Sequence, residues 1–269
     1  MRKLHWFRRI AGFFVGAVFM VQAVPAFAQQ SSAAVYAGAL SVDSGFDDRY
    51  FGGGYIDHYL DNGLGVHAEA SGVSREESAG FFAGGFSYAL NDSVRPKVVA
   101  GSSTSNDDVL PEFYFRGSVD VRSDSELGLV ATPSVTYRKY DNGTKETVPG
   151  LDLAIYLPSF ANGSYVVAQA IGKVMFVDPG DNTGYEVGGG ASLVNPDFGS
   201  LGIVVTGGEM AYDSVLVANA ASIENDFVSV RPNLGLSLSD DVEFFVSGEY
   251  THTDFYDIVG GFAGLKITY

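Results

Sequence analysis

Two residues near the C-terminus have types and spacing suited to hydrolytic chemistry. His252 and Asp254 are two positions apart in THTDF, and an imidazole beside a carboxylate can serve as a general base. Such a site would also need a second pair of carboxylates across from it, for which Asp47 and Asp48 are the candidates. Nothing in the sequence brings these segments together, so solvated loop residues are the preferred interpretation.

A second arrangement with chemical potential is the combination of His67 and Ser71 in HAEAS. A serine activated by a histidine can carry out acyl transfer. The two residues have the same parity in a segment of alternating hydrophobicity, where His67 is better explained as an interior polar residue paired with Glu69 or with a residue of a neighbouring strand. We therefore predict no enzyme.

Metal and cofactor sites have little support. The chain has no cysteine, which excludes zinc–thiolate sites. The triple glycines at 52–54 and 188–190 lack the strand–turn–helix setting of a phosphate loop. Seven dispersed aspartates could bind calcium weakly, but their spacing matches no calcium loop, and a solvated acidic surface is preferred; they are Asp43, Asp47, Asp48, Asp107, Asp108, Asp178 and Asp181. No cofactor is predicted.

The first residues have the order of a secretory signal peptide. Four bases and no acid in MRKLHWFRRI precede an apolar run, which ends at PAFAQQ with small residues at Ala26 and Ala28. We predict a signal peptide over 1–28 and one domain over 29–269. Loss of four of the 16 bases leaves 12 bases against 32 acids, a net charge of −20. Such an acidic chain is not expected to bind nucleic acid.

Hydrophobic residues make up 46% of the chain, yet no segment after residue 28 has 18 continuous apolar residues. Instead they alternate with polar residues, as in DFVSVRPNLGLSL at 226–238. The alternating segments are roughly 10–14 residues long, against about 5–6 for strands of soluble proteins and about 9–11 for membrane strands. Polar connections separate them, and those at alternate positions are often longer and acidic.

This pattern predicts an all-β fold, a transmembrane antiparallel up-and-down β-barrel of about 14 strands, with 12 or 16 as alternatives. An even number puts both termini on the periplasmic side of an outer membrane. The expected strands are 32–43, 48–60, 64–74, 79–90, 94–102, 109–122, 126–140, 144–157, 163–176, 184–194, 199–211, 225–238, 242–252 and 256–269.

The chain stops on FAGLKITY, inside the last expected strand. In a closed barrel the last strand pairs with the first, so this ending predicts closure. Gly264, Ile267 and Tyr269 also resemble the C-terminal signal that the barrel assembly machinery recognises. That pattern prefers a polar residue where Phe262 stands.

Alternation also predicts which ionisable residues face the interior. They are His67, Glu69, Arg95, Lys97, Glu112, Arg116, Asp120, Arg122, Arg138, Asp152, Glu186, Arg231, Glu243, Glu249 and Lys266. Five bases fall on neighbouring strands and form what we call the basic stripe: Arg95, Lys97, Arg116, Arg122 and Arg138. The stripe has two interpretations, a salt-bridged filling of the lumen or the lining of a pore that favours anionic solutes.

The block from VLPEFYFRGSVDVR through SELGLVATPSVTYRKYDNGTKETVPGLDLAIYLP resembles the YaiO family of outer-membrane β-barrels. The resemblance covers about 50 residues, carries no catalytic motif, and implies a role in exopolysaccharide production or export. We therefore expect a non-enzymatic barrel in the outer membrane of a Gram-negative bacterium, surrounded by lipid and lipopolysaccharide. It would serve as a conduit or an accessory for the passage of an exopolysaccharide, such as an anionic polysaccharide, or of small solutes across that membrane. A structural or adhesion barrel with a filled lumen and a hydrolase at the rim are the alternatives.

Overall fold

The computed structural model describes residues 30–43, 48–74, 78–104, 110–123, 128–157, 160, 163–211 and 225–269. The predicted signal peptide at 1–28 lies outside these residues. The described part contains 14 strands and no helix that could cross a membrane. The strands are β1 Ser32–Val42, β2 Arg49–Tyr59, β3 Leu64–Ser74, β4 Ser78–Tyr88, β5 Val94–Ser103, β6 Phe113–Arg122, β7 Leu129–Lys139, β8 Lys145–Tyr156, β9 Tyr165–Asp178, β10 Asn182–Asn195, β11 Gly199–Met210, β12 Asn225–Ser237, β13 Val242–Thr253 and β14 Asp257–Thr268.

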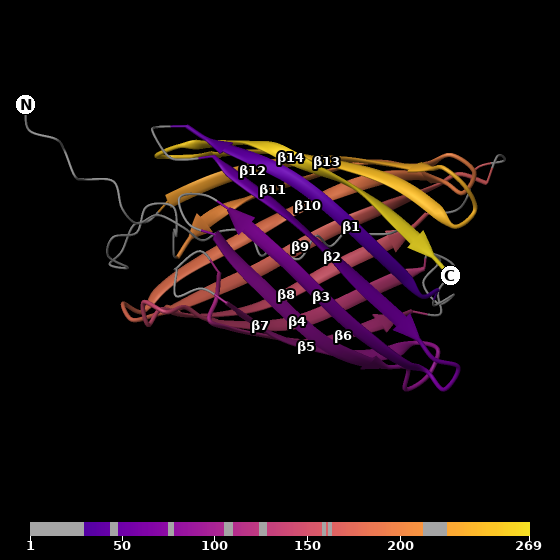
Figure 1. Cartoon of the computed structure of the whole chain (residues 1–269), viewed down its shortest axis with the longest axis horizontal. Coiled ribbons are helices and arrows are strands. Elements are labelled where there is room, and N and C mark those ends of the chain that lie inside the picture. The colour runs from indigo at the N-terminus through magenta and orange to yellow at the C-terminus, as the bar shows by residue number, and fades with distance from the viewer. Residues whose placement is uncertain are drawn as a thin grey trace, which may run out of the picture.

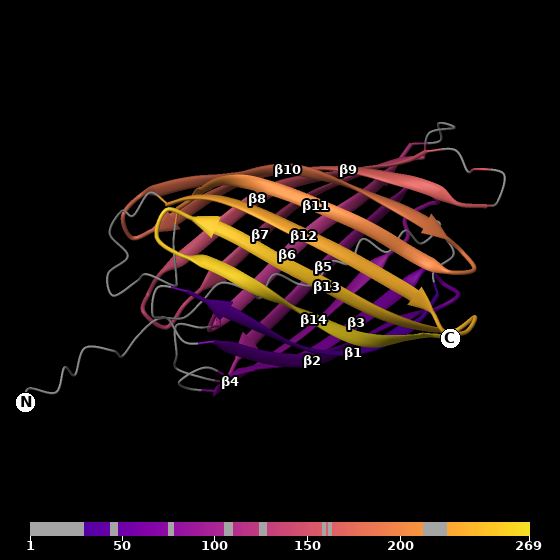
Figure 2. The ribbon, with the colours of Figure 1, turned by 90° about the horizontal axis from the view of Figure 1, so that it is seen from above.

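The strands form one closed antiparallel barrel in which every strand pairs with its neighbours in sequence, and β1 pairs with β14. The closing pair runs in register from Ser32 opposite Thr268 to Val42 opposite Ile258. Figures 1 and 2 show β1 beside β14, with the strands strongly tilted to the barrel's long axis. The predicted fold class and strand number are confirmed.

The pairing register fixes the width of the barrel. We traced the residue paired with Ser32 on β2, which is Asp57, then its partner on β3, which is His67, and so on around the barrel, extending each ladder where a strand ends. The trace reaches β1 again at position 46 of its numbering instead of position 32. The stagger is therefore 14 residues for 14 strands. Strand number, stagger and size are linked, and this combination gives a tilt of roughly 37° and a backbone diameter of roughly 25 Å.

The outward face of the wall is apolar. Large side chains such as Val35, Phe82, Val187 and Leu265 are 43–62% exposed there. An exposed apolar surface that surrounds the whole wall is suited to lipid and not to water. Around the closing pair, however, the outward positions hold small residues, which include Ala37, Gly52, Gly54, Gly261 and Ala263.

The two ends of the barrel differ less than the sequence predicted. We call the end where β1 begins and β14 ends the terminal end, and the opposite end the far end. We expected the far-end connections to be often longer, but those that follow β3, β9 and β13 have only three residues each. The difference arises because β9 continues to Asp178 and β10 begins at Asn182, so residues counted as a loop belong to strands.

Glycine is required where a neighbouring ring lies against the inner wall. A Cβ atom on Gly38 would lie 2.5 Å from Cβ of Phe262 and 2.7 Å from Cζ of Phe51, distances that force a displacement. At Gly172, a Cβ atom would meet nothing within 4 Å.

We therefore expect Gly38→Ala to destabilise the folded barrel by about 1–3 kcal/mol, the usual cost of overpacking. Gly172→Ala should be nearly neutral. Urea unfolding in lipid vesicles, followed by the electrophoretic difference between folded and unfolded barrels, measures both. Equal midpoints for the two variants would contradict the close packing at Gly38.

Candidate functional site: the lumen of the barrel

The inner face of the wall is rich in charge. The register places nine of the 12 bases that follow residue 28 on inward positions of the described strands. The nine bases are Arg49, Arg95, Lys97, Arg116, Arg122, Arg138, Lys173, Arg231 and Lys266. Eight acids share the inner face: Asp57, Glu69, Asp120, Glu146, Asp152, Glu186, Glu243 and Glu249. Although the chain as a whole is strongly acidic, most of its bases therefore lie in the lumen.

The five bases of the basic stripe follow one side of the lumen from end to end. Arg95 and Arg122 lie on β5 and β6 near the terminal end, Lys97 and Arg116 lie further along, and Arg138 lies on β7 near the far end. All five are inward. Their role in solute passage stays a prediction.

The far half of the basic stripe is neutralised by ion pairs. Arg138 Nη1 lies 2.5 Å from Glu146 Oε2, and the Glu146 side chain is only 1% exposed. Arg116 Nη2 lies 3.8 Å from Asp152 Oδ2. A paired base adds little to the field that a passing anion meets, so these two residues contribute mainly to the wall.

In the terminal half of the basic stripe, Arg95 and Lys97 form no ion pair with a described residue. Within the described part of the chain, Lys97 has no ion-pair or hydrogen-bond partner, although it lies near His67 and Asp57. Arg95 lies opposite Asp120 without an ion pair, and its guanidinium carbon is 5.5 Å from the centre of the Tyr59 ring. Arg95 and Lys97 are therefore the cations best placed to attract an anion.

Two further charged clusters line the lumen. Glu186 accepts from Lys173 Nζ at 2.8 Å and lies 3.5 Å from Arg231 Nη2. On β2 and β3, His67 Nδ1 lies 2.9 Å from Asp57 and its Nε2 lies 3.8 Å from Glu69. The sequence analysis did not place Asp57, Glu146 or Lys173 inside, although parity relative to Asp152 on the same strand could have done so for Glu146.

The walls of the lumen stand further apart than two packed sheets. Packed sheets interdigitate their side chains at a separation of about 10 Å, whereas opposite walls here are roughly 25 Å apart at the backbone. Asp152, which points inward near the middle of β8, accordingly keeps 39% of its side chain exposed. The geometry therefore favours a lumen that contains water.

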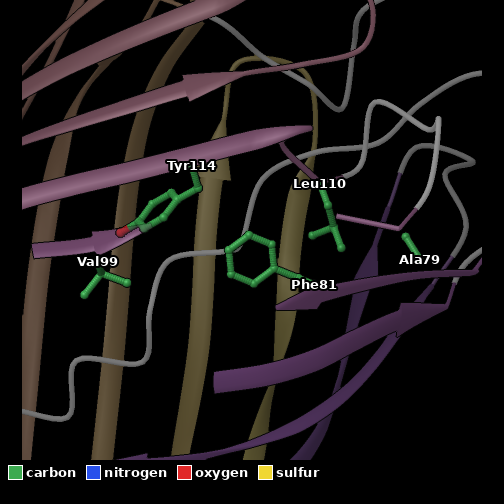
Figure 3. Close-up of a cluster of buried hydrophobic side chains, with 5 residues drawn as sticks. All are labelled: Ala79, Phe81, Val99, Leu110 and Tyr114. Atoms are coloured by element: carbon green, nitrogen blue, oxygen red, sulfur yellow. The ribbon is translucent and has the colours of Figure 1, made fainter. Parts of the chain in front are cut away.

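Apolar side chains gather on the inner face towards the far end, which the sequence analysis did not foresee. One cluster contains Ala79, Phe81, Val99, Leu110 and Tyr114 and is shown in Figure 3. Its Phe81 and Tyr114 rings meet edge to face at 5.9 Å. Two similar clusters surround Met175 and Ile258. Each cluster includes a residue that follows or precedes a strand, Leu110, Ala211 or Tyr256, so connecting segments contribute to the lining of this mouth.

Neither of the two arrangements weighed for catalysis is formed among the described residues. His252 pairs with Asp257 at 2.6 Å on the rim and not with Asp254, whose carboxylate accepts from the backbone of Asp226. Asp48 is described and Asp47 lies outside the described residues. His67 bonds to Asp57, and no hydrogen bond links it to Ser71.

Several acidic residues lie on the rim of the barrel, and one of them was expected on the inner face. Glu112, expected inside, precedes β6 and pairs with Lys139 at 2.6 Å, with both side chains more than 40% exposed. Asp178 pairs with Lys145 in the same way, and Asp43 accepts from the backbone of Asp257. Among the described residues no group of three or more acids and histidines could hold a metal ion.

A closed barrel of 14 strands with an apolar exterior and a charged interior defines the class: a transmembrane β-barrel. Solved outer-membrane proteins share this fold. A bacterial polysaccharide outer-membrane secretin has a TM-score of 0.57 and 8% identity, with 89% of this chain and 98% of that chain covered. OccK3 (OpdO) and OpdQ of Pseudomonas aeruginosa each have a TM-score of 0.50, with 10% and 8% identity, and the match covers 89% of this chain and 95% and 98% of theirs.

At these identities the likeness concerns the fold. No protein-family model and no curated protein matches the sequence. The resemblance to the YaiO family therefore stays a prediction.

The Arg138–Glu146 pair gives a test of the inner wall. Glu146→Gln leaves the Arg138 guanidinium without its counter-charge, and breaking a buried pair costs roughly 3–5 kcal/mol. Glu112→Gln removes an exposed pair and should cost less than about 1 kcal/mol. Urea midpoints in vesicles compare the two, and a Glu146→Gln barrel as stable as Glu112→Gln would show that the pair does not stabilise the wall.

Proposed function

We propose that the chain forms a water-filled pore in the outer membrane of a Gram-negative bacterium, through which small solutes pass with a preference for anions. The observation that carries this proposal is that Arg95 and Lys97 form no ion pair with a described residue, inside a lumen whose walls stand too far apart to pack against each other.

The passenger in this proposal is an anionic solute or an acidic glycan. One similar fold belongs to a protein named as a polysaccharide secretin, and the resemblance to the YaiO family implies exopolysaccharide export. Both support a glycan as one class of passenger.

The proposed membrane setting follows from the wall. The apolar exterior would face lipid and lipopolysaccharide. The terminal end would face the periplasm, because its connections have at most eight residues, whereas two at the far end have nine and 14. Gly264, Ile267 and Tyr269 would be recognised by the barrel assembly machinery. Ile267 and Tyr269 point outward and are 51% and 63% exposed, whereas Gly264 lies on the inner face.

Reconstitution of the folded protein into planar bilayers tests the pore directly. We expect discrete conductance steps in potassium chloride. Correctly folded protein that gives no conductance steps would refute the proposed pore. The alternative, a structural barrel with a filled lumen, would then remain, and the ion pairs of the inner wall support it.

Charge selectivity tests the basic stripe. The double variant Arg95→Gln, Lys97→Gln should shift the reversal potential in a salt gradient towards cation preference, because it removes two positive charges that form no ion pair. Lys139→Gln changes a base on the rim and serves as the matched control. An unchanged reversal potential in the double variant would show that the anion preference does not come from these residues.

A further inference from the structure

Four aromatic side chains, one from each of four adjacent strands, share the inner face around the closing pair of the barrel. Phe262 on β14 lies at the centre, with ring centroids 6.2 Å from Tyr36 on β1, 6.2 Å from Phe51 on β2 and 6.3 Å from Phe245 on β13. We call these four residues the aromatic platform. It is an apolar surface in a lumen whose other mid-height positions are mainly polar, charged or small.

The platform lies against the wall. The tip of Phe51 lies over Gly38, where a Cβ atom would be 2.7 Å away, and Cε2 of Phe245 lies equally close to the Cβ position of Gly264. Rings held over glycines on neighbouring strands do not extend across the lumen. Phe245 is buried, whereas Tyr36, Phe51 and Phe262 stay partly exposed. The exposed parts of these rings are available to a passing solute.

Hydrogen-bonding groups border the platform. The Tyr36 hydroxyl donates to Glu69 Oε1 at 3.5 Å. Ser247 lies directly opposite Phe262 in the β13–β14 register, and its hydroxyl meets only backbone carbonyl oxygens, at 3.4–3.5 Å. A ligand on the rings therefore finds donors and acceptors at its edge.

Cations lie across the lumen from the platform. In a ring of 14 strands β6 and β13 are seven strands apart, so they face each other. Arg116 lies on β6, and Arg95 and Lys97 lie on the adjacent β5. Arg116 is paired with Asp152, so the bases on that side of the lumen without an ion pair to a described residue are Lys97 and Arg95, which lie nearer the terminal end.

We propose that the aromatic platform is a binding subsite for acidic oligosaccharides, an inference that rests on the proposed pore and specifies its passenger. A pyranose ring has a face of C–H groups that packs on the negative face of an aromatic ring, hydroxyls at its edge that bond to groups such as Tyr36 and Ser247, and, in a uronic acid, a carboxylate that the opposite wall attracts. A small inorganic anion would use only the cations, and a neutral sugar only the rings.

The platform also has a packing role, because an aromatic side chain that covers a glycine on the neighbouring strand stabilises a sheet. Leucine separates the two roles. It retains most of the apolar volume over the glycine but has no ring face on which a sugar can stack.

The test compares wild type, the double variant Phe51→Leu, Phe262→Leu, and the control Phe82→Leu, which removes an outward ring that is 57% exposed to lipid. The probe is a linear tetrasaccharide of glucuronic acid. Maltotetraose, a neutral sugar, and citrate, a small anion, each have one of its two properties and serve as comparison ligands. Binding is measured by calorimetry on folded protein in detergent and by the duration of blocked states in bilayers. Folding of each variant is checked by its electrophoretic mobility before and after heating.

We expect the uronate to bind wild type and the control equally, and the double variant roughly tenfold more weakly, the effect of losing about 1.4 kcal/mol of ring contact. The unblocked conductance should not change. Equal affinity for the double variant and wild type would overturn the subsite, as would citrate binding as tightly as the uronate. Because calorimetry needs no conductance, a barrel that binds uronate through the rings but conducts no ions would refute the pore and keep the subsite.

Discussion

The structure depends on one requirement: inside a membrane, every backbone N–H and C=O group must find a partner within the protein, because lipid offers none. A sheet meets this requirement only when its two edge strands pair with each other. The pairing of β1 with β14 along their whole length is therefore the interaction on which the other features rest. Once the ring is closed, the alternation of each strand assigns every side chain either to the lipid or to the lumen.

Closure also determines what the lumen can hold. The register produces a stagger equal to the strand number, so the walls stand too far apart for their side chains to interdigitate. Charged residues that would be costly in a dry core can then remain hydrated. The inner wall combines ion pairs that stabilise neighbouring strands, such as Lys173 with Glu186, with bases that have no such partner, such as Lys97. Width and charge together support the proposed passage of anions.

The sequence predicted the architecture well because the period of two is independent of tertiary detail. The expected strand 64–74 coincides with β3, and most boundaries fall within three residues. Alternation also placed Arg116 and Glu186 on the inner face. Partners across strands were harder to predict, because they depend on the register: His252 meets Asp257 and not the nearer Asp254. Glu112 was misplaced because parity applies only inside a strand, and β6 begins one residue later.

The apolar clusters at the far end could not be predicted for a related reason. Leu110 lies outside any strand, and only the packing of its connecting segment brings it to Phe81 and Tyr114. The aromatic platform follows from residues on two distant parts of the chain, since Tyr36 and Phe51 meet Phe245 and Phe262 only through closure. Each ring alone is an ordinary strand residue.

Around the closing pair the large side chains lie on the inner face and the small ones on the outer face, with aromatic rings inside and alanine or glycine outside. Over evolutionary time this reversal sets different limits on the two faces. At outward positions such as Ala37, a larger side chain extends into fluid hydrocarbon, which adapts to its shape. At Gly38, one residue further along, any added atom meets a fixed ring. In this sector, variation among homologues should therefore accumulate on the lipid side, and side-chain size should be held constant on the side that faces the water.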